Sequence, residues 1–136
     1  MIRITKLLYL LDVEYFRDHG KTYTELQWVY YKYGPYSFEL EEIILQSGIT
    51  IEEEFISTDK SIKKLYLKNI EESEIEPMLE NYLNKLWSIW GTESLYTLLD
   101  FVYYKTEPML NVVNRGNILN FNTIAKYTGN KKDKMD

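Results

Sequence analysis

The chain lacks cysteine and holds a single histidine, His19, among its 136 residues. Without cysteine it can form no disulfide framework, no zinc–thiolate site and no cysteine nucleophile. One imidazole is too few for a histidine-rich metal site, and it argues against a catalytic triad that depends on histidine. We therefore expect a protein without a metal or any other cofactor.

A long hydrophobic run is also absent. The most apolar stretch, residues 7–11, is flanked closely by two basic and two acidic side chains, whereas a membrane-spanning helix needs about 20 apolar residues. No small-residue cleavage site follows it, as a secretion signal would require. We expect a soluble, cytoplasmic protein with no membrane contact. Its length predicts one domain, residues 1–127, followed by a flexible tail at residues 128–136.

Motifs of catalysis are missing as well. The sequence contains no glycine-rich dinucleotide fingerprint and no phosphate loop. It also lacks the Gly-x-Ser-x-Gly elbow of hydrolases. The acidic run Glu52–Glu54 is typical of a solvated strand surface, and no calcium-binding loop is present. An enzyme built from carboxylates and tyrosine hydroxyls would need an enclosed pocket with shifted carboxylates. We predict a protein that is not an enzyme.

Tyrosine and acidic residues are abundant. Thirteen tyrosines bring the aromatic share to 15%, and the net charge is −5. Residues 71–108 hold two lysines against eight acidic residues, whereas residues 109–136 hold five basic and two acidic residues. An acidic body repels a phosphate backbone, so nucleic acid is not the partner that this composition favours.

Hydrophobic spacing predicts a mainly α-helical chain. Apolar residues recur at intervals of three and four in four predicted helices: 2–18, 38–47, 77–90 and 92–105. Residues that favour strands predict an extended segment and a β-hairpin: 26–33, then 49–56 paired with 62–70. Residues 109–127 give no clear pattern. The fold class is α+β, mainly α-helical, a compact domain with a small β-hairpin or three-stranded sheet and a winged-helix-like order in its N-terminal half.

Aromatic rings gather around Gly34-Pro35, a pair that breaks regular structure. Tyrosine and tryptophan are enriched at interface hot spots, so some of these rings could contact a partner. The alternative for each ring is to pack at the edge of the core with its hydroxyl group in water. We expect a partner protein to contact Trp28, Tyr31, Tyr33, Tyr36, Glu39 and Glu42. We expect Gly34, Pro35 and Ser37 to be structural, with Ser37 as the N-cap of the following helix.

The winged-helix-like order raises DNA binding as an alternative. The helix at 38–47 would then be the recognition helix, but it carries Glu39, Glu41 and Glu42, which would repel phosphates. The hairpin offers lysines for backbone contacts instead: Lys60, Lys63, Lys64 and Lys68. Within the hairpin, Lys63, Lys64 and Lys68 should also lie opposite the acidic run 52–54.

Three stretches carry a family resemblance. Residues 5–12 read Thr-Lys-Leu-Leu-Tyr-Leu-Leu-Asp, Gly20-Lys21 follows, and residues 31–37 read Tyr-Lys-Tyr-Gly-Pro-Tyr-Ser. Together they resemble the SocA-like antitoxin family, whose domain is also called Panacea. A later block, Leu99–Pro108, is similar to the second block of the family, but its histidine is absent here and Met109 stands where tryptophan is common.

The resemblance implies a mostly helical domain with a small β element. It also implies a non-enzymatic, antitoxin-like module that binds and neutralises a protein toxin encoded nearby, in a toxin–antitoxin or phage-associated system. An acidic surface would steer association with a basic toxin. A winged-helix-like regulator that binds DNA is the alternative function.

Overall fold

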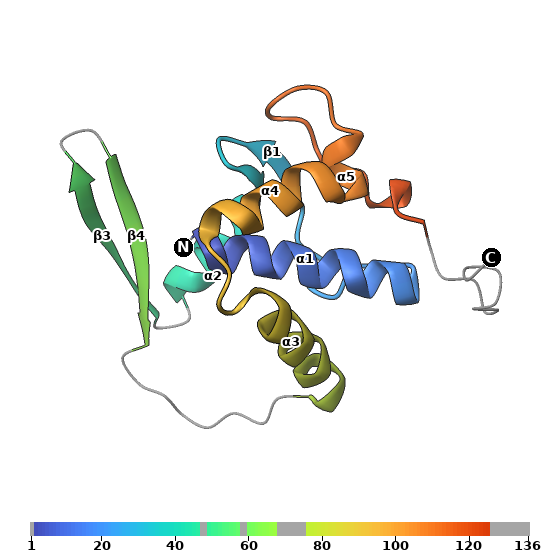
Figure 1. The fold of residues 1–136 in the computed structure, drawn as a ribbon, viewed down its shortest axis with the longest axis horizontal. Helices are drawn as coiled ribbons and strands as arrows, with labels where there is room; N and C mark the ends of the chain where they lie inside the picture. Colours follow the sequence, from blue (N-terminus) through green and yellow to red (C-terminus); the bar gives the residue numbers. More distant parts are fainter. Residues whose placement is uncertain (1, 47–48, 58–59, 68–75, 126–136) are drawn as a thin grey trace.

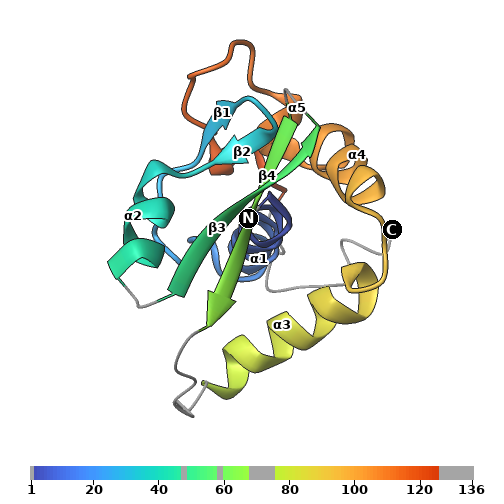
Figure 2. The same cartoon turned by 90° about the vertical axis from the view of Figure 1, so that its left-hand side faces the viewer.

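Helix α1 (Ile2–His19) runs through the middle of the molecule, and the other elements lie around it (Figures 1 and 2). The computed structural model describes residues 2–46, 49–57, 60–67 and 76–125. Gly20, at φ 76°, ends the helix, because this left-handed conformation costs glycine little. Buried apolar residues of α1 form the centre of the core: Tyr9, Leu10, Leu11, Val13 and Phe16.

The later part of the chain adds three helices and one 3-10 turn: α3 (Pro77–Trp90), α4 (Leu95–Lys105), α5 (Glu107–Leu110) and η1 (Phe121–Thr123). Figure 2 looks along α1 and shows α3 and α4 on two of its sides. Leu86 and Trp90 of α3 join the core that contains α1, as do Leu98 and Val102 of α4. Proline opens α3 in its first turn, where the missing N–H has no helical partner to lose.

The start of α4 differs from the prediction. The predicted helix begins at residue 92, but Ser94 is the N-cap, and its Oγ accepts the backbone N–H of Thr97 at 3.1 Å. Gly91 keeps a right-handed helical conformation after α3. The chain therefore changes direction only after Gly91, and α4 begins at Leu95.

A short β-hairpin follows α1 and consists of β1 (Val29–Tyr31) and β2 (Gly34–Tyr36). We expected Gly34-Pro35 to end the extended segment, and β1 does end before these residues, but they also form the second strand, which the sequence did not predict. Pro35 lies opposite Tyr30 in this hairpin. Proline has no N–H to donate, but the backbone N–H and carbonyl of Tyr30 form their hydrogen bonds with residues 117 and 116 on the other side of β1, so proline is tolerated in β2. A bridge between Val29 and Ile118 extends this pairing.

The second hairpin follows α2 (Phe38–Gln46) and pairs β3 (Ile49–Ser57) with β4 (Lys60–Leu67). Its register places residue 52 opposite residue 64 and residue 53 opposite residue 63, as the charge pattern predicts. In Figure 1 this hairpin lies beyond the N-terminal end of α1. Lys68 and the predicted tail at 128–136 lie outside the described residues.

The structure confirms a mainly α-helical α+β fold with small antiparallel β elements. The described strands form two separate two-stranded sheets rather than one sheet of three strands. The expected order of helix, β element, helix and hairpin is present in the N-terminal half. Among the helices that the structure describes, none has the length and hydrophobicity of a membrane span.

Candidate functional site

Three aromatic side chains pack on one another at the surface where the first hairpin meets α2. Tyr31 and Tyr36 come from the two strands, and Phe38 is the first residue of α2. Their ring centroids lie 5.0–5.6 Å apart, and Phe38 meets both tyrosines edge to face. Phe38 is nevertheless 58% exposed. We call Tyr31, Tyr36 and Phe38 the hairpin aromatic cluster; Tyr33 lies beside it in the hairpin turn and is also exposed.

Carboxylates border the hairpin aromatic cluster. Tyr36 donates its hydroxyl hydrogen bond to Glu41 at 2.5 Å. Burial, together with this hydrogen bond and the charge of Glu41, raises the pKa of Tyr36 above its ordinary value. Glu39 is exposed and accepts the backbone N–H of Gln27 at 3.0 Å, and Glu42 is exposed on the same helix. The cluster thus presents aromatic rings within a negatively charged border.

Buried contacts hold the hairpin in place beneath the cluster. Gly34 has φ +94°, and a Cβ at this position would approach the Tyr103 ring of α4 to 3.2 Å. The carbonyl of Pro35 accepts a hydrogen bond from Lys6 Nζ at 2.5 Å. Burial lowers the pKa of Lys6 to about 8. Ser37 Oγ accepts the backbone N–H of Leu40, which is the N-cap hydrogen bond of α2.

Trp28 does not belong to the exposed surface, so the expectation that it faces a partner is wrong. Its side chain is only 1% exposed. The indole Nε1 donates to Asp12 at 2.8 Å, and the ring meets Tyr9 edge to face. Asp12 also accepts hydrogen bonds from the backbone of Tyr23 and from Thr24. A buried carboxylate needs these donors, and Trp28 is one of them.

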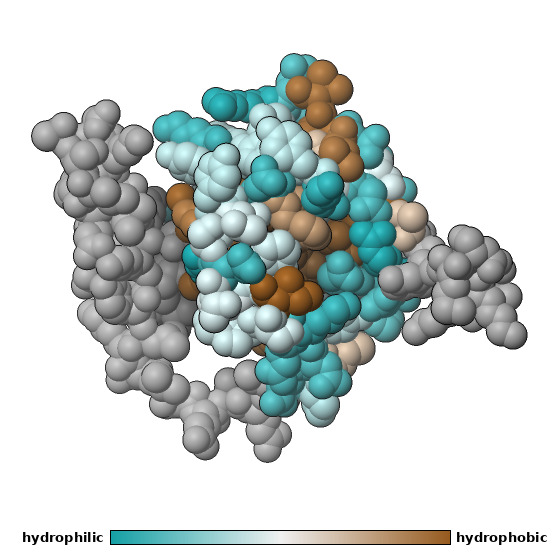
Figure 3. All heavy atoms as spheres, in the orientation of Figure 1, coloured by the Kyte–Doolittle hydropathy of each residue, from teal (hydrophilic) through white to brown (hydrophobic). Residues whose placement is uncertain are grey.

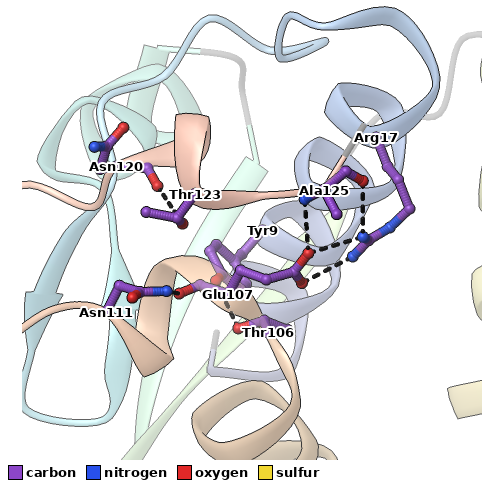
Figure 4. Close-up of polar contacts among 8 residues, drawn as sticks. All are labelled: Tyr9, Arg17, Thr106, Glu107, Asn111, Asn120, Thr123 and Ala125. Atoms are coloured by element: carbon purple, nitrogen blue, oxygen red, sulfur yellow. Dashed lines mark hydrogen bonds and ion pairs between the residues drawn. The ribbon is translucent and has the colours of Figure 1, made fainter. Parts of the chain in front are cut away.

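A second polar network joins the C-terminal part of the described chain to α1 (Figure 4). Arg17 donates two hydrogen bonds to the Glu107 carboxylate, at 2.8 and 2.9 Å, and they lower the pKa of Glu107. The same carboxylate accepts the backbone N–H of Ala125. Tyr9 and Thr106 share a buried hydrogen bond of 2.7 Å. Each of these groups is occupied in holding the fold together.

The described part of the chain offers no group of three or more metal-ligating side chains. Its aromatic and acidic surface residues are suited to contacting another protein. A family model described as antitoxin SocA-like, Panacea domain, matches residues 4–133. The chain belongs to this family. Neither the comparison with curated proteins nor that with solved structures gives a match.

Membership of the SocA-like family indicates an antitoxin-like, non-enzymatic role and implies a partner, in keeping with the resemblance seen in the sequence. α2 carries exposed Glu39 and Glu42, which does not suit a helix that approaches DNA. The lysines proposed for DNA contacts lie in the second hairpin, whose side chains are outside the described part of the structure.

Sequence reasoning missed two sets of exposed rings in this SocA-like chain. Phe38 is not among the predicted partner-facing residues, yet it completes the hairpin aromatic cluster. Tyr96 and Tyr104 of α4 are 81% and 64% exposed. The signal for the second set was present, because tyrosines eight residues apart with Asp100 midway share one face of a helix.

Proposed function

We propose that this SocA-like chain neutralises a protein toxin, encoded by a neighbouring gene, through direct binding at the hairpin aromatic cluster in the cytoplasm. The proposal rests above all on one observation: Phe38, Tyr31 and Tyr36 pack on one another while the Phe38 ring is mostly in water. A partner that covers these rings removes apolar surface from water. Family membership supplies the antitoxin-like role.

The chemistry of the surface favours a basic partner. Glu39 and Glu42 lie exposed on α2, and the whole chain has a net charge of −5. Complementary charge accelerates encounter between proteins and suppresses contact with other acidic surfaces. The rings would then contribute most of the affinity, since aromatic residues dominate interface hot spots. Tyr33, in the hairpin turn, would add contact area at the edge of the interface.

The test is co-expression of the chain with the product of the adjacent gene, followed by growth measurement and calorimetric titration of the purified proteins. Wild type should restore growth. Tyr31→Ala combined with Phe38→Ala should abolish rescue and weaken binding by about 30-fold or more, the cost of losing a hot spot. Trp87→Ala removes an exposed ring from α3 and is the matched control.

The double variant should keep the circular dichroism spectrum and melting temperature of the wild type, because both rings lie at the surface. A neighbouring product that does not inhibit growth, or a toxin that the wild type fails to neutralise, would refute the antitoxin role. Full rescue by the double variant would refute the assignment of the surface.

A further inference from the structure

A second aromatic surface lies on α4, separate from the hairpin aromatic cluster. Tyr96, Asp100 and Tyr104 are spaced four residues apart and share one face of the helix. With Leu99 and Tyr103 they line an open hollow of about 230 Å³, which we call the α4 hollow. In Figure 3 the surface over α4 is mostly pale, as tyrosines are on this scale, with isolated hydrophilic residues.

Among the described residues that line the α4 hollow, Asp100 is the acidic one. It is exposed, and within the described part of the chain it makes no hydrogen bond or ion pair. Lys105 follows five residues later, which places it on a different side of the helix. Arg115 lies near Tyr103, and its charge partly offsets the burial that raises the pKa of Tyr103. The Asp100 carboxylate is thus a single unpaired charge among tyrosine rings.

We propose that the α4 hollow binds the guanidinium group of an arginine carried by a protein partner. A guanidinium is flat and stacks on aromatic rings. It also donates two parallel hydrogen bonds to one carboxylate. Tyr96 and Tyr104 supply rings on either side of Asp100 along the helix, so the hollow offers both kinds of contact. An ammonium group is compact and strongly hydrated and would use only part of this site.

Charge complementarity fixes the kind of partner. The chain has a net charge of −5, and Asp100 supplies a negative charge in the hollow itself, so a basic group of a partner is the complementary one. The identification of the partner as the toxin rests on the proposed function. The Tyr103 ring, which lines the hollow, also contacts the Gly34 position of β2. The hollow therefore adjoins the hairpin, and one basic partner could contact both.

The recognition step is tested on the full chain with a defined probe, N-acetyl-arginine amide, in an NMR titration of the isotope-labelled protein. Saturable shifts should appear in α4, and the lysine analogue should bind more weakly. Asp100→Asn should weaken binding about tenfold, as expected on losing a hydrogen bond between charged groups. Glu80→Gln, which makes the same change in charge on α3, should leave binding unchanged. Equal binding by wild type and Asp100→Asn, or by the lysine analogue, would overturn the proposal.

The second arm measures affinity for the toxin. Asp100→Asn should lower it, with a smaller loss in Glu80→Gln. If Asp100→Asn binds the toxin as wild type does while the Tyr31→Ala, Phe38→Ala variant fails, the proposed function stands and the hollow assignment is overturned. Arginine binding that needs Asp100, without any toxin complex, supports the hollow and refutes the proposed function. Self-association that disappears in Asp100→Asn would assign the hollow to Arg115 of a second copy and overturn the partner proposal.

Discussion

Replacement of Lys6 by methionine should change how the stability of the protein depends on pH. Lys6 is buried in α1, and its Nζ has the Pro35 carbonyl as its hydrogen-bond partner. Burial lowers its pKa from 10.5 to about 8. Below pH 8 both the folded and the unfolded chain carry the proton. Between about 8 and 10.5 the unfolded chain keeps a proton that the folded chain has lost at this lysine, so the contribution of Lys6 to the free energy of unfolding rises with pH.

The magnitude follows from the two pKa values. A difference of about 2.5 units at ~1.36 kcal/mol per unit gives about 3 kcal/mol in total. About 2 kcal/mol of this should develop between pH 7.5 and pH 10. Methionine at position 6 has no proton to lose, so the Lys6→Met variant should lack this rise. At pH 10 a tyrosine with an ordinary pKa is half ionised, and subtraction of the Lys6→Met curve removes this contribution, which both proteins share.

The assay is urea unfolding at several pH values, followed by the fluorescence of buried Trp28 and Trp90. Lys21→Met removes an exposed lysine and should follow the wild-type curve. If wild type and Lys6→Met give parallel curves between pH 7.5 and 10, Lys6 titrates normally and its burial beneath the hairpin is wrong.

Three further predictions concern the contacts that hold the fold. Gly34→Ala should destabilise the chain by about 1 kcal/mol or more, because φ is +94° and the added Cβ would crowd an α4 tyrosine; thermal unfolding would show this, and an unchanged melting temperature would count against it. Trp28→Phe should cost about 1–3 kcal/mol in urea unfolding, since Asp12 loses a buried donor; a stability equal to wild type would contradict the hydrogen bond. Arg17 lowers the pKa of Glu107 in the folded chain below its ordinary value of 4.5. The contribution of Glu107 to the free energy of unfolding is therefore fully present above pH 4.5 and is lost as the pH falls through the lowered pKa. Glu107→Gln should therefore show a flatter loss of stability than wild type in acid titrations followed by circular dichroism.

Local sequence signals predicted much of the fold. The spacing of apolar residues located α1, and the proline and serine signals located the starts of α3 and α2. These features depend on residues within a few positions of one another. The motif around Gly34-Pro35 also led to the correct family.

The errors arose where distant residues decide the outcome. Pro35 can occupy a strand because the backbone of Tyr30 bonds to residues 116 and 117 instead, a pairing that no local pattern reveals. Trp28 lies in the hydrophobic core, where its indole N–H donates to Asp12, sixteen residues earlier in the chain. Among the predicted site residues, Tyr31 and Tyr36 meet in the structure, together with Phe38, which was not predicted. Only the three-dimensional fold distinguishes these surface rings from the neighbouring, buried Trp28.

The contacts between α1 and residues far along the chain have a consequence for synthesis on the ribosome. Tyr9 and Arg17 emerge early, yet their partners Thr106 and Glu107 lie 97 and 90 residues further along the chain. Structures with such distant contacts fold more slowly than those built from near neighbours. A nascent chain interrupted before Thr106 would leave α1 without these polar partners, so a message terminated early would yield polypeptide that is open to proteases rather than a finished domain.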